Sequence, residues 1–238
     1  MRPRVVLWLR PVLERCGTLR RLSRTSAGRV RLAFDRPGAA EESDFDRVVL
    51  AIPFTTLRSV ERHVELPPAK LRSIQELGYG TNAKLIGAFD ARVWNADGRN
   101  GNVIADNGLP CGWDALRGQD QGATAAYTVF PGGSGGLACG RGSAEDAFAA
   151  SLPALNRVFK GASGAHRAGS ALRMHWPTAP YALGSYTCFR PGQTFDGIAD
   201  AAGPIHFAGE HTSLLHQGYM EGAAESGDRC AAEITASR

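Results

Sequence analysis

The C-terminal part of the chain has residue types and spacings suited to an electron-rich ligand. Residues 204–234 are PIHFAGEHTSLLHQGYMEGAAESGDRCAAEI. A short apolar strand comes first, the chain turns at Gly209, and a helix of small residues follows Gly218. A strand, a glycine turn and a helix N-terminus together direct backbone N–H groups toward such a ligand. The pattern therefore predicts a ligand site at this turn and at the start of the final helix.

This segment resembles the C-terminal flavin-binding segment of the FAD-dependent amine oxidases, a family that includes monoamine oxidases, polyamine oxidases and L-amino-acid oxidases. The resemblance rests on FAGEHTS and GYMEGA, in that order and spacing. It extends upstream through three further blocks: DRVVLAIPFTTLRSVE, LPPAKLRSIQELGYGTNAKLIGAFDARVW and WPTAPYALGSYTCFRPGQ. Together these blocks cover most of residues 45–94 and 174–234.

The resemblance assigns roles to the matching residues of the final segment. It implies that Gly209 and Glu210 lie beside the FAD ribityl–pyrophosphate and that the backbone N–H of Met220 faces the flavin pyrimidine edge. Tyr219 would face the substrate. The helix that Gly218 opens would place the positive end of its dipole near the negative charge of a reduced flavin. An ordinary close-packed helix would explain the small residues alone, but not the matched motifs.

Lys84 lies in a mostly apolar segment and therefore needs a partner. Taken alone, it is a lysine at a strand end that reaches solvent. By the resemblance, a lysine at this place holds a water against flavin N5, close to the hydride transfer and the later reaction with oxygen. The matching block favours this second interpretation.

Aromatic residues crowd the loop from Trp176 to Phe189 and could cap a core. The resemblance implies instead that Tyr186 and Tyr219 form two walls of an aromatic cage, and we count Trp176 among the cofactor-binding residues. Aromatic faces suit an amine substrate. Some relatives attach FAD through a cysteine just before this tyrosine. Ser185 stands there, so the expected cofactor is non-covalent FAD.

Several other chemistries have weaker support. Three histidines recur every five residues, at 206, 211 and 216, but no cysteine accompanies them and they fall in a strand and a loop, so we assign no metal. They are expected near an anionic cofactor. The nucleophile motif GxSxG is absent, and the GGSGG loop lacks the Lys-Ser/Thr of a P-loop.

The resemblance implies an FAD-dependent oxidoreductase that oxidatively deaminates an amine or L-amino acid, with O2 as acceptor and H2O2 as product. No GxGxxG motif, which grips the FAD pyrophosphate in this family, occurs in the 238 residues. The chain therefore corresponds to the C-terminal half of such an enzyme. Truncation, a misassigned start and a split enzyme with a separate N-terminal-half chain are the three explanations. The alternative function is a non-catalytic remnant, or one half that needs its partner chain.

The distribution of charge and the cysteine content indicate which binding partners and which cellular compartment to expect. Residues 1–36 carry ten arginines against Glu14 and Asp35, a balance of +8, so the remainder carries −4 of the net +4. This basic arm contains one aromatic residue before Phe34 and no known nucleic-acid module, so nucleic-acid binding is not expected.

The sequence predicts a cytoplasmic protein. It has five scattered cysteines without a CxxC pair, no apolar run of membrane-spanning length, and an apolar stretch at its start that is too short for a secretory signal.

Hydrophobic periodicity predicts an α/β protein with a mixed sheet. Residues 5–24 are expected to be an interrupted helix or irregular. The expected strands are 29–34, 48–52, 83–89, 102–105, 124–130, 172–176 and 205–208, and the expected helices are 67–78, 143–159 and one after Gly218. The predicted division is an arginine-rich arm at 1–36, FAD-domain strands at 37–60, a mixed-sheet substrate domain at 61–175 and a C-terminal FAD-binding segment at 176–238. The βαβ unit that begins an FAD domain is missing from this set.

Overall fold

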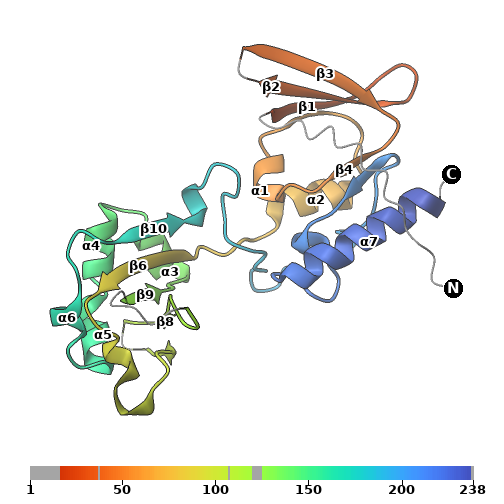
Figure 1. The fold of residues 1–238 in the computed structure, drawn as a ribbon. Coiled ribbons are helices and arrows are strands. Elements are labelled where there is room, and N and C mark those ends of the chain that lie inside the picture. The colour runs from red at the N-terminus through yellow and green to blue at the C-terminus, as the bar shows by residue number, and fades with distance from the viewer. Residues whose placement is uncertain (1–16, 37, 107, 120–124, 237–238) are drawn as a thin grey trace, which may run out of the picture.

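The computed structural model describes residues 17–36, 38–106, 108–119 and 125–236. These residues form two lobes joined by two chain segments (Figure 1). Each lobe has its own hydrophobic core. The N-terminal and C-terminal parts of the described chain share the first lobe, and the middle of the chain forms the second.

An antiparallel meander forms one end of the first lobe. Strands β1 (Thr18–Arg24), β2 (Val30–Arg36) and β3 (Ala39–Phe45) follow one another, and the short β5 (Glu61–His63) joins β1 in parallel, giving the order β3-β2-β1-β5. Leu22, Val30 and Leu32 are buried on one face. The interrupted helix proposed for residues 5–24 is therefore wrong for residues 18–24, and its remaining part lies largely outside the described residues.

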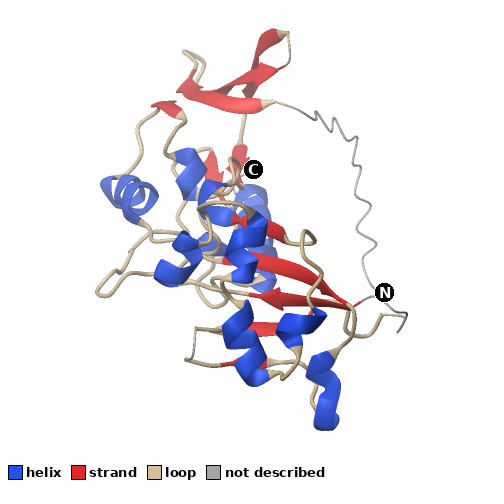
Figure 2. Cartoon of the chain, turned by 90° about the vertical axis from the view of Figure 1, so that its left-hand side faces the viewer, coloured by secondary structure: helices blue, strands red, loops and turns tan. Residues whose placement is uncertain are grey.

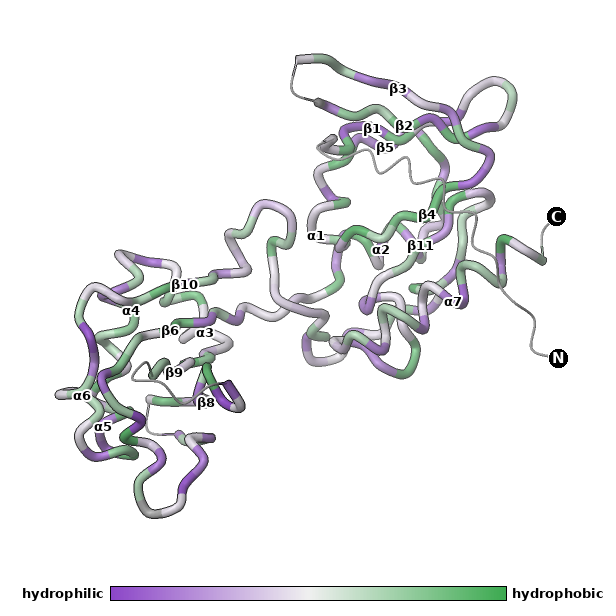
Figure 3. The backbone as a smooth tube through the Cα atoms, in the orientation of Figure 1, coloured by the Kyte–Doolittle hydropathy of each residue, from purple (hydrophilic) through white to green (hydrophobic). Residues whose placement is uncertain are grey.

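Ion pairs cross the meander and neutralise four of its arginines. The pairs are Arg20–Asp35, Arg21–Glu42, Arg29–Asp46 and Arg31–Asp44. The hydrogen bond from Arg31 holds the pKa of the Asp44 carboxyl below its usual value. Part of the β3 tube is purple in Figure 3, which marks its hydrophilic residues. The arginine-rich sequence in this part of the chain thus forms cross-strand pairs rather than a free basic surface.

A two-stranded parallel sheet lies at the centre of the first lobe. β4 (Val48–Leu50) pairs with β11 (Ile205–Phe207), and all three residues of β11 are buried. Three helices pack around it: α1 (Phe54–Leu57), α2 (Pro68–Glu76) and α7 (Met220–Ala236). This core contains Leu22, Val48, Leu50, Phe54, Leu57, Leu66, Ile74, Leu77, Ile205 and Phe207.

The second lobe is a five-stranded sheet with helices on one face. The strand order is β10-β6-β9-β8-β7, from Leu172–His175, Ala83–Phe89, Ala125–Val129, Cys111–Asp114 and Val103–Ile104. The described helices are η1 (Val93–Gly98), α3 (Gly133–Ala138), α4 (Ala144–Ala149), α5 (Leu152–Val158) and α6 (Ala162–Ala165). Figure 2 shows this lobe from its helical side.

Alternation along β6 separates the two faces of this sheet. Ala83, Leu85, Gly87 and Phe89 are buried, and Phe89 packs edge-on against Phe148 of α4. Lys84 and Ile86 point to the opposite face, where Leu172 and Met174 of β10 are their direct cross-strand neighbours. Those two side chains are exposed, so the face that carries Lys84 is the uncovered one.

Most predicted elements are present, but two have other bounds than expected, and most of the expected GGSGG loop lies in the helix α3. The single helix expected over residues 143–159 breaks into α4 and α5, because Pro153 cannot continue a helix through the preceding turn. Ser143 caps α4, because its hydroxyl accepts from the Asp146 backbone N–H at 3.0 Å. The strand expected over residues 48–52 ends at Leu50, and Val49 is exposed. The strand β3 was not predicted.

The change from one core to the other falls between Leu77 and Ala83. Leu66, Ile74 and Leu77 pack in the first core, so β5 and α2 lie with the first lobe, whereas the predicted division grouped all of residues 61–175. In the described part of the chain, no helix combines the length and apolar content needed to cross a membrane.

Candidate active site

The two segments that join the lobes pair with each other. The Gly80 N–H donates to the Tyr186 carbonyl at 2.8 Å, and the Ser185 N–H donates to the Gly80 carbonyl at 2.8 Å. An isolated bridge joins Tyr79 to Thr187. The pairing fixes the backbone of Tyr186 beside the segment that continues into β6 and Lys84.

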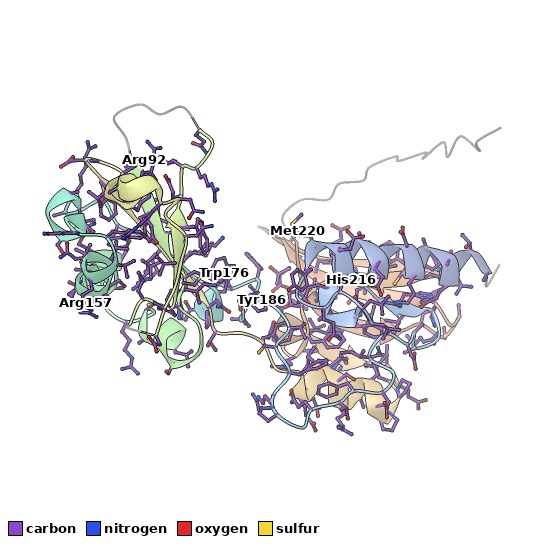
Figure 4. The ribbon with its side chains drawn as sticks, turned by 90° about the horizontal axis from the view of Figure 1, so that it is seen from below. Arg92, Arg157, Trp176, Tyr186, His216 and Met220 are labelled. Carbon is purple, nitrogen blue, oxygen red and sulfur yellow. The ribbon has the colours of Figure 1, made fainter. Side chains whose placement is uncertain are left out.

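Tyr186 and Tyr219, predicted as a pair, lie in neighbouring loops. A Cβ placed on Gly218 would lie 3.8 Å from the Tyr186 ring, so that ring packs on the residue before Tyr219. Tyr186 is 40% exposed and Tyr219 is 72% exposed. Figure 4 shows Tyr186 close to Trp176 at the junction of the lobes. The structure thus brings the two segments together and leaves both rings open to a ligand.

The Glu210 carboxylate connects these two loops. Its Oε1 accepts from the Thr187 backbone N–H and hydroxyl, both at 3.0 Å, and its Oε2 accepts from the Gly218 N–H at 2.6 Å. Glu210 begins the short helix η3 (Glu210–Thr212), directly after Gly209, whose φ is +118°. The resemblance placed Glu210 beside the cofactor, and here its carboxylate is occupied by donors from its own chain.

The helix α7 starts immediately after Tyr219. Its buried residues Gly222, Ser226 and Cys230 recur every four positions and face β11 and η3. The Ser226 hydroxyl accepts from the Gly209 N–H at 2.8 Å, which ties the glycine turn to the helix. Gly218 has φ +82°, a left-handed conformation that favours glycine. The first N–H groups of α7 have no intrahelical acceptor, and the Met220 side chain is 90% exposed.

Glu225 of α7 holds the loop before Tyr219 from the opposite side. Its carboxylate accepts from the Ser213 hydroxyl at 2.7 Å, the Leu214 N–H at 3.2 Å and His216 Nδ1 at 3.1 Å. The hydrogen bond from Ser213, followed by that from His216, holds the pKa of Glu225 below its usual value. The loop that carries Tyr219 is therefore fixed by Glu225 at its start and by Glu210 at its end.

Three aromatic rings surround the Lys84 ammonium. The Nζ atom lies 5.7 Å from the ring centroids of Trp113 and Trp176 and 5.8 Å from that of Phe130. These distances are in the range of cation–π attraction. Among the described residues, Lys84 Nζ makes no hydrogen bond or ion pair, so its N–H donors remain available to a water or a ligand. Trp176, predicted to contact the cofactor, is one of these three rings.

The three histidines of the final segment have separate environments. His206 pairs with Glu233 at 2.7 Å, and His216 pairs with Glu225. His211 is buried with its ring 4.4 Å from that of Phe54, and burial, with a smaller effect of Lys70, lowers its pKa to about 4. Within the described ranges, no group of three His, Cys, Asp or Glu side chains is placed to hold a metal.

Sequence reasoning missed several residues of this site. Thr187 follows the predicted Tyr186 directly, but its bond to Glu210 depends on a contact between distant segments. Trp113 lies in β8 and Phe130 directly follows β9, and only the sheet brings them to Lys84. The local sequence gives no sign of these contacts, because they depend on the pairing of strands that lie far apart in the chain.

Comparison with known proteins now decides the family. A sequence model of the flavin containing amine oxidoreductases matches residues 15–235. The chain belongs to this family. Membership implies a flavin cofactor and oxidoreductase chemistry, and it confirms the resemblance drawn from the motifs.

Two relatives indicate the range of the family. YobN of Bacillus subtilis (strain 168), provisionally named an L-amino-acid oxidase, is 30% identical over 216 residues, which are 87% of this chain and 45% of YobN. The precursor of an L-glutamate oxidase from Streptomyces viridosporus is 27% identical over an alignment that covers 84% of this chain and 40% of the relative. The chain thus spans less than half the length of these relatives.

Solved structures of amine oxidases share the fold. Cyclohexylamine oxidase from Brevibacterium oxydans IH-35A superposes with a TM-score of 0.75 at 20% identity, over 91% of this chain and 47% of that enzyme. A redesigned triple mutant of putrescine oxidase superposes with a TM-score of 0.77 at 21% identity, over 93% and 49%. At this identity the likeness establishes the fold alone, a mixed α/β fold found in part of an amine oxidase.

Proposed function

We propose that this chain forms the flavin-ring and substrate side of an FAD-dependent oxidase. The reaction is the oxidative deamination of a small amine or L-amino acid, with O2 as the electron acceptor and H2O2 as product. The observation that carries the proposal is the continuous set of hydrogen bonds from Gly80, before β6, through Tyr186 and Thr187 to Glu210 and Gly218. This set connects the strand of Lys84 to both tyrosines.

The residues at the start of α7 fit a flavin. The left-handed Gly218 brings the backbone close to the helix start, the first helical N–H groups lack intrahelical acceptors, and Tyr219 and Met220 leave that side open. The position before Tyr186 is Ser185, whose hydroxyl donates to Asn82 Oδ1 at 2.8 Å. With no sulfur there, we expect FAD to be held without a covalent bond.

A flavin, when bound, supplies a two-electron acceptor. The chain's own residues then have three tasks. Tyr186 and Tyr219 orient the amine by their ring faces, Lys84 offers its free N–H donors to a water beside the reacting carbon, and the aromatic rings around Lys84 hold its ammonium in place by cation–π attraction. The amine would give a hydride from carbon to the two-electron acceptor and a proton from nitrogen to solvent, leaving an imine, and the two electrons with two protons would reduce O2 to H2O2. Water then hydrolyses the imine to an aldehyde or keto acid and releases ammonia or an amine.

A second candidate function has its own observation. Four apolar side chains around the start of α7 are strongly exposed: Leu214, Leu215, Tyr219 and Met220, at 69, 80, 72 and 90%. A surface patch of this kind is typical of an interaction site. In this second function the chain binds a partner chain through these side chains, either as one half of a split enzyme or as a non-catalytic remnant.

Anaerobic flavin reduction tests the proposal. The purified chain is incubated with FAD and a panel of monoamines, diamines and L-amino acids, and loss of the visible flavin band is followed, with peroxide measured after air is admitted. The proposal predicts reduction that Lys84→Met slows by about 100-fold or more. Lys160→Met, at an exposed lysine, is the matched control and should behave as the parent. Flavin that binds but is never reduced by any panel member would favour the second candidate.

A further inference from the structure

The two tyrosines belong to segments with no common element. Tyr186 follows η2 (Trp176–Thr178) in an irregular loop, whereas Tyr219 immediately precedes α7. Neither a helix nor a strand sets the distance between them. A contact from elsewhere must therefore fix their relative position.

Glu210 makes that contact on both sides at once. Thr187, the residue after Tyr186, donates its N–H and hydroxyl to one carboxylate oxygen, and Gly218, the residue before Tyr219, donates its N–H to the other. Hydrogen bonds to a carboxylate are roughly twice as strong as those between neutral groups. Among the described residues, Glu210 forms no ion pair, so these three donors are its observed stabilisation.

The rest of each tyrosine's backbone is already fixed. The Tyr186 carbonyl accepts from Gly80, and the Tyr219 N–H donates to the His216 carbonyl at 3.2 Å. Glu210 is itself anchored, because the N–H of the preceding Gly209 donates to Ser226 of α7. Among the described residues, the carboxylate thus links the two segments by hydrogen bonds, beside the packing of the Tyr186 ring on Gly218.

We propose that Glu210 is a positioning residue that sets the spacing of Tyr186 and Tyr219. The role of that spacing in holding an amine rests on the proposed function. The link itself does not rest on the proposed function. In this link the Glu210 carboxylate binds the protein's own chain rather than the cofactor alone.

The test labels all five tyrosines with 3-fluorotyrosine and records ¹⁹F NMR spectra of the chain without flavin. Resonances are assigned by single Tyr→Phe changes. In Glu210→Ala, the Tyr186 and Tyr219 resonances should shift or broaden, while Tyr127, buried in the second lobe, stays unchanged. Glu210→Gln should change these resonances less than Glu210→Ala does, because its amide oxygen can accept from one segment but not from both. A merely destabilising change would not select these two resonances.

Amide hydrogen exchange provides the second readout. Exchange at Thr187 and Gly218 should accelerate at least tenfold in Glu210→Ala, since both N–H groups lose their acceptor. Thr187→Val removes only the hydroxyl and should leave Gly218 protected. Glu221→Gln, which removes a charge from an exposed residue of the same region, is the matched control and should change neither readout.

The outcomes separate this inference from the proposed function. Unchanged tyrosine resonances and unchanged exchange in a folded Glu210→Ala protein would overturn the positioning role, even if the chain oxidises amines. Changed resonances and exchange support it, even if no amine reduces the flavin. If Glu210→Ala does not fold, Glu210→Gln carries both measurements, and equal protection of Thr187 and Gly218 in that variant would overturn the inference.

Discussion

The Glu210 carboxylate lies 2.6 Å from the backbone nitrogen of Gly218, while its other oxygen holds Thr187. Through this relationship one side chain joins the glycine turn, the loop of Tyr186 and the start of α7. These are the parts of the chain that the family resemblance associates with the flavin ring and the substrate.

Two glycines of α7 should respond oppositely to alanine. A Cβ on Gly222 would lie 2.1 Å from the His216 carbonyl oxygen, so the backbone of the loop before Tyr219 would have to move. We expect Gly222→Ala to lower the free energy of unfolding by about 1–3 kcal/mol. A Cβ on the exposed Gly227 meets nothing within 4 Å, so Gly227→Ala should raise it by about 0.5–1 kcal/mol. Urea unfolding measures both, and equal effects would contradict the packing of α7 on this loop.

His211 should make stability depend on pH in the acidic range. Burial lowers its pKa from 6.5 to about 4, so the unfolded chain binds more protons than the folded chain between these values. Stability contributed by the neutral ring is therefore complete above pH 6.5 and lost as the pH falls toward 4. Between pH 7.5 and 5 the loss should be roughly 2 kcal/mol.

His211→Leu should remove this contribution, which urea midpoints at several pH values will measure. His63→Leu, at an exposed histidine of β5, is the matched control. An identical pH dependence of unfolding in His211→Leu and the parent protein would show that His211 does not titrate as its burial requires.

A buried ion pair should stabilise the second lobe. Asp114 accepts from Arg92 and from the Trp94 indole, both at 3.0 Å, and both acidic and basic side chains are nearly inaccessible. Asp114→Ala leaves a buried guanidinium without its partner and should cost about 3–5 kcal/mol. Glu76→Ala removes an exposed partner of Arg72 and should cost less than about 0.5 kcal/mol. Tryptophan fluorescence during urea unfolding compares the two, and similar losses would contradict the burial of the Arg92 pair.

Local sequence patterns predicted the elements with strong periodicity. Strand β6 has the predicted bounds, Ala83–Phe89, because its apolar residues alternate against one core. The final strand and helix were also predicted, since glycines mark both ends of the loop between them. In contrast, β3 is rich in Glu and Asp, and its strand conformation depends on pairing with β2 and on ion pairs to arginines. Such stabilisation cannot be inferred from the segment alone.

The candidate site, like the fold, could be predicted only in part from local sequence patterns. The motifs indicated the ligand turn and the two tyrosines, and the structure places their segments together. The aromatic surroundings of Lys84 were not predicted, because Trp113 reaches it only through the order β6-β9-β8. The role of Glu210 also required the structure, since its donors Thr187 and Gly218 lie far apart in the sequence and are neighbours only in the folded chain.

Flavin titration of the purified chain tests the central claim most directly. Because the chain offers the α7 turn but no GxGxxG motif, the isoalloxazine ring should dominate binding. We expect FAD and riboflavin to bind with dissociation constants of about 100 µM or tighter, within tenfold of each other, and Gly222→Ala to weaken both while Gly227→Ala does not. Flavin fluorescence and absorption after addition of the chain provide the measurement. No binding of either flavin, or weakening by neither glycine variant, would contradict a flavin site at the start of α7.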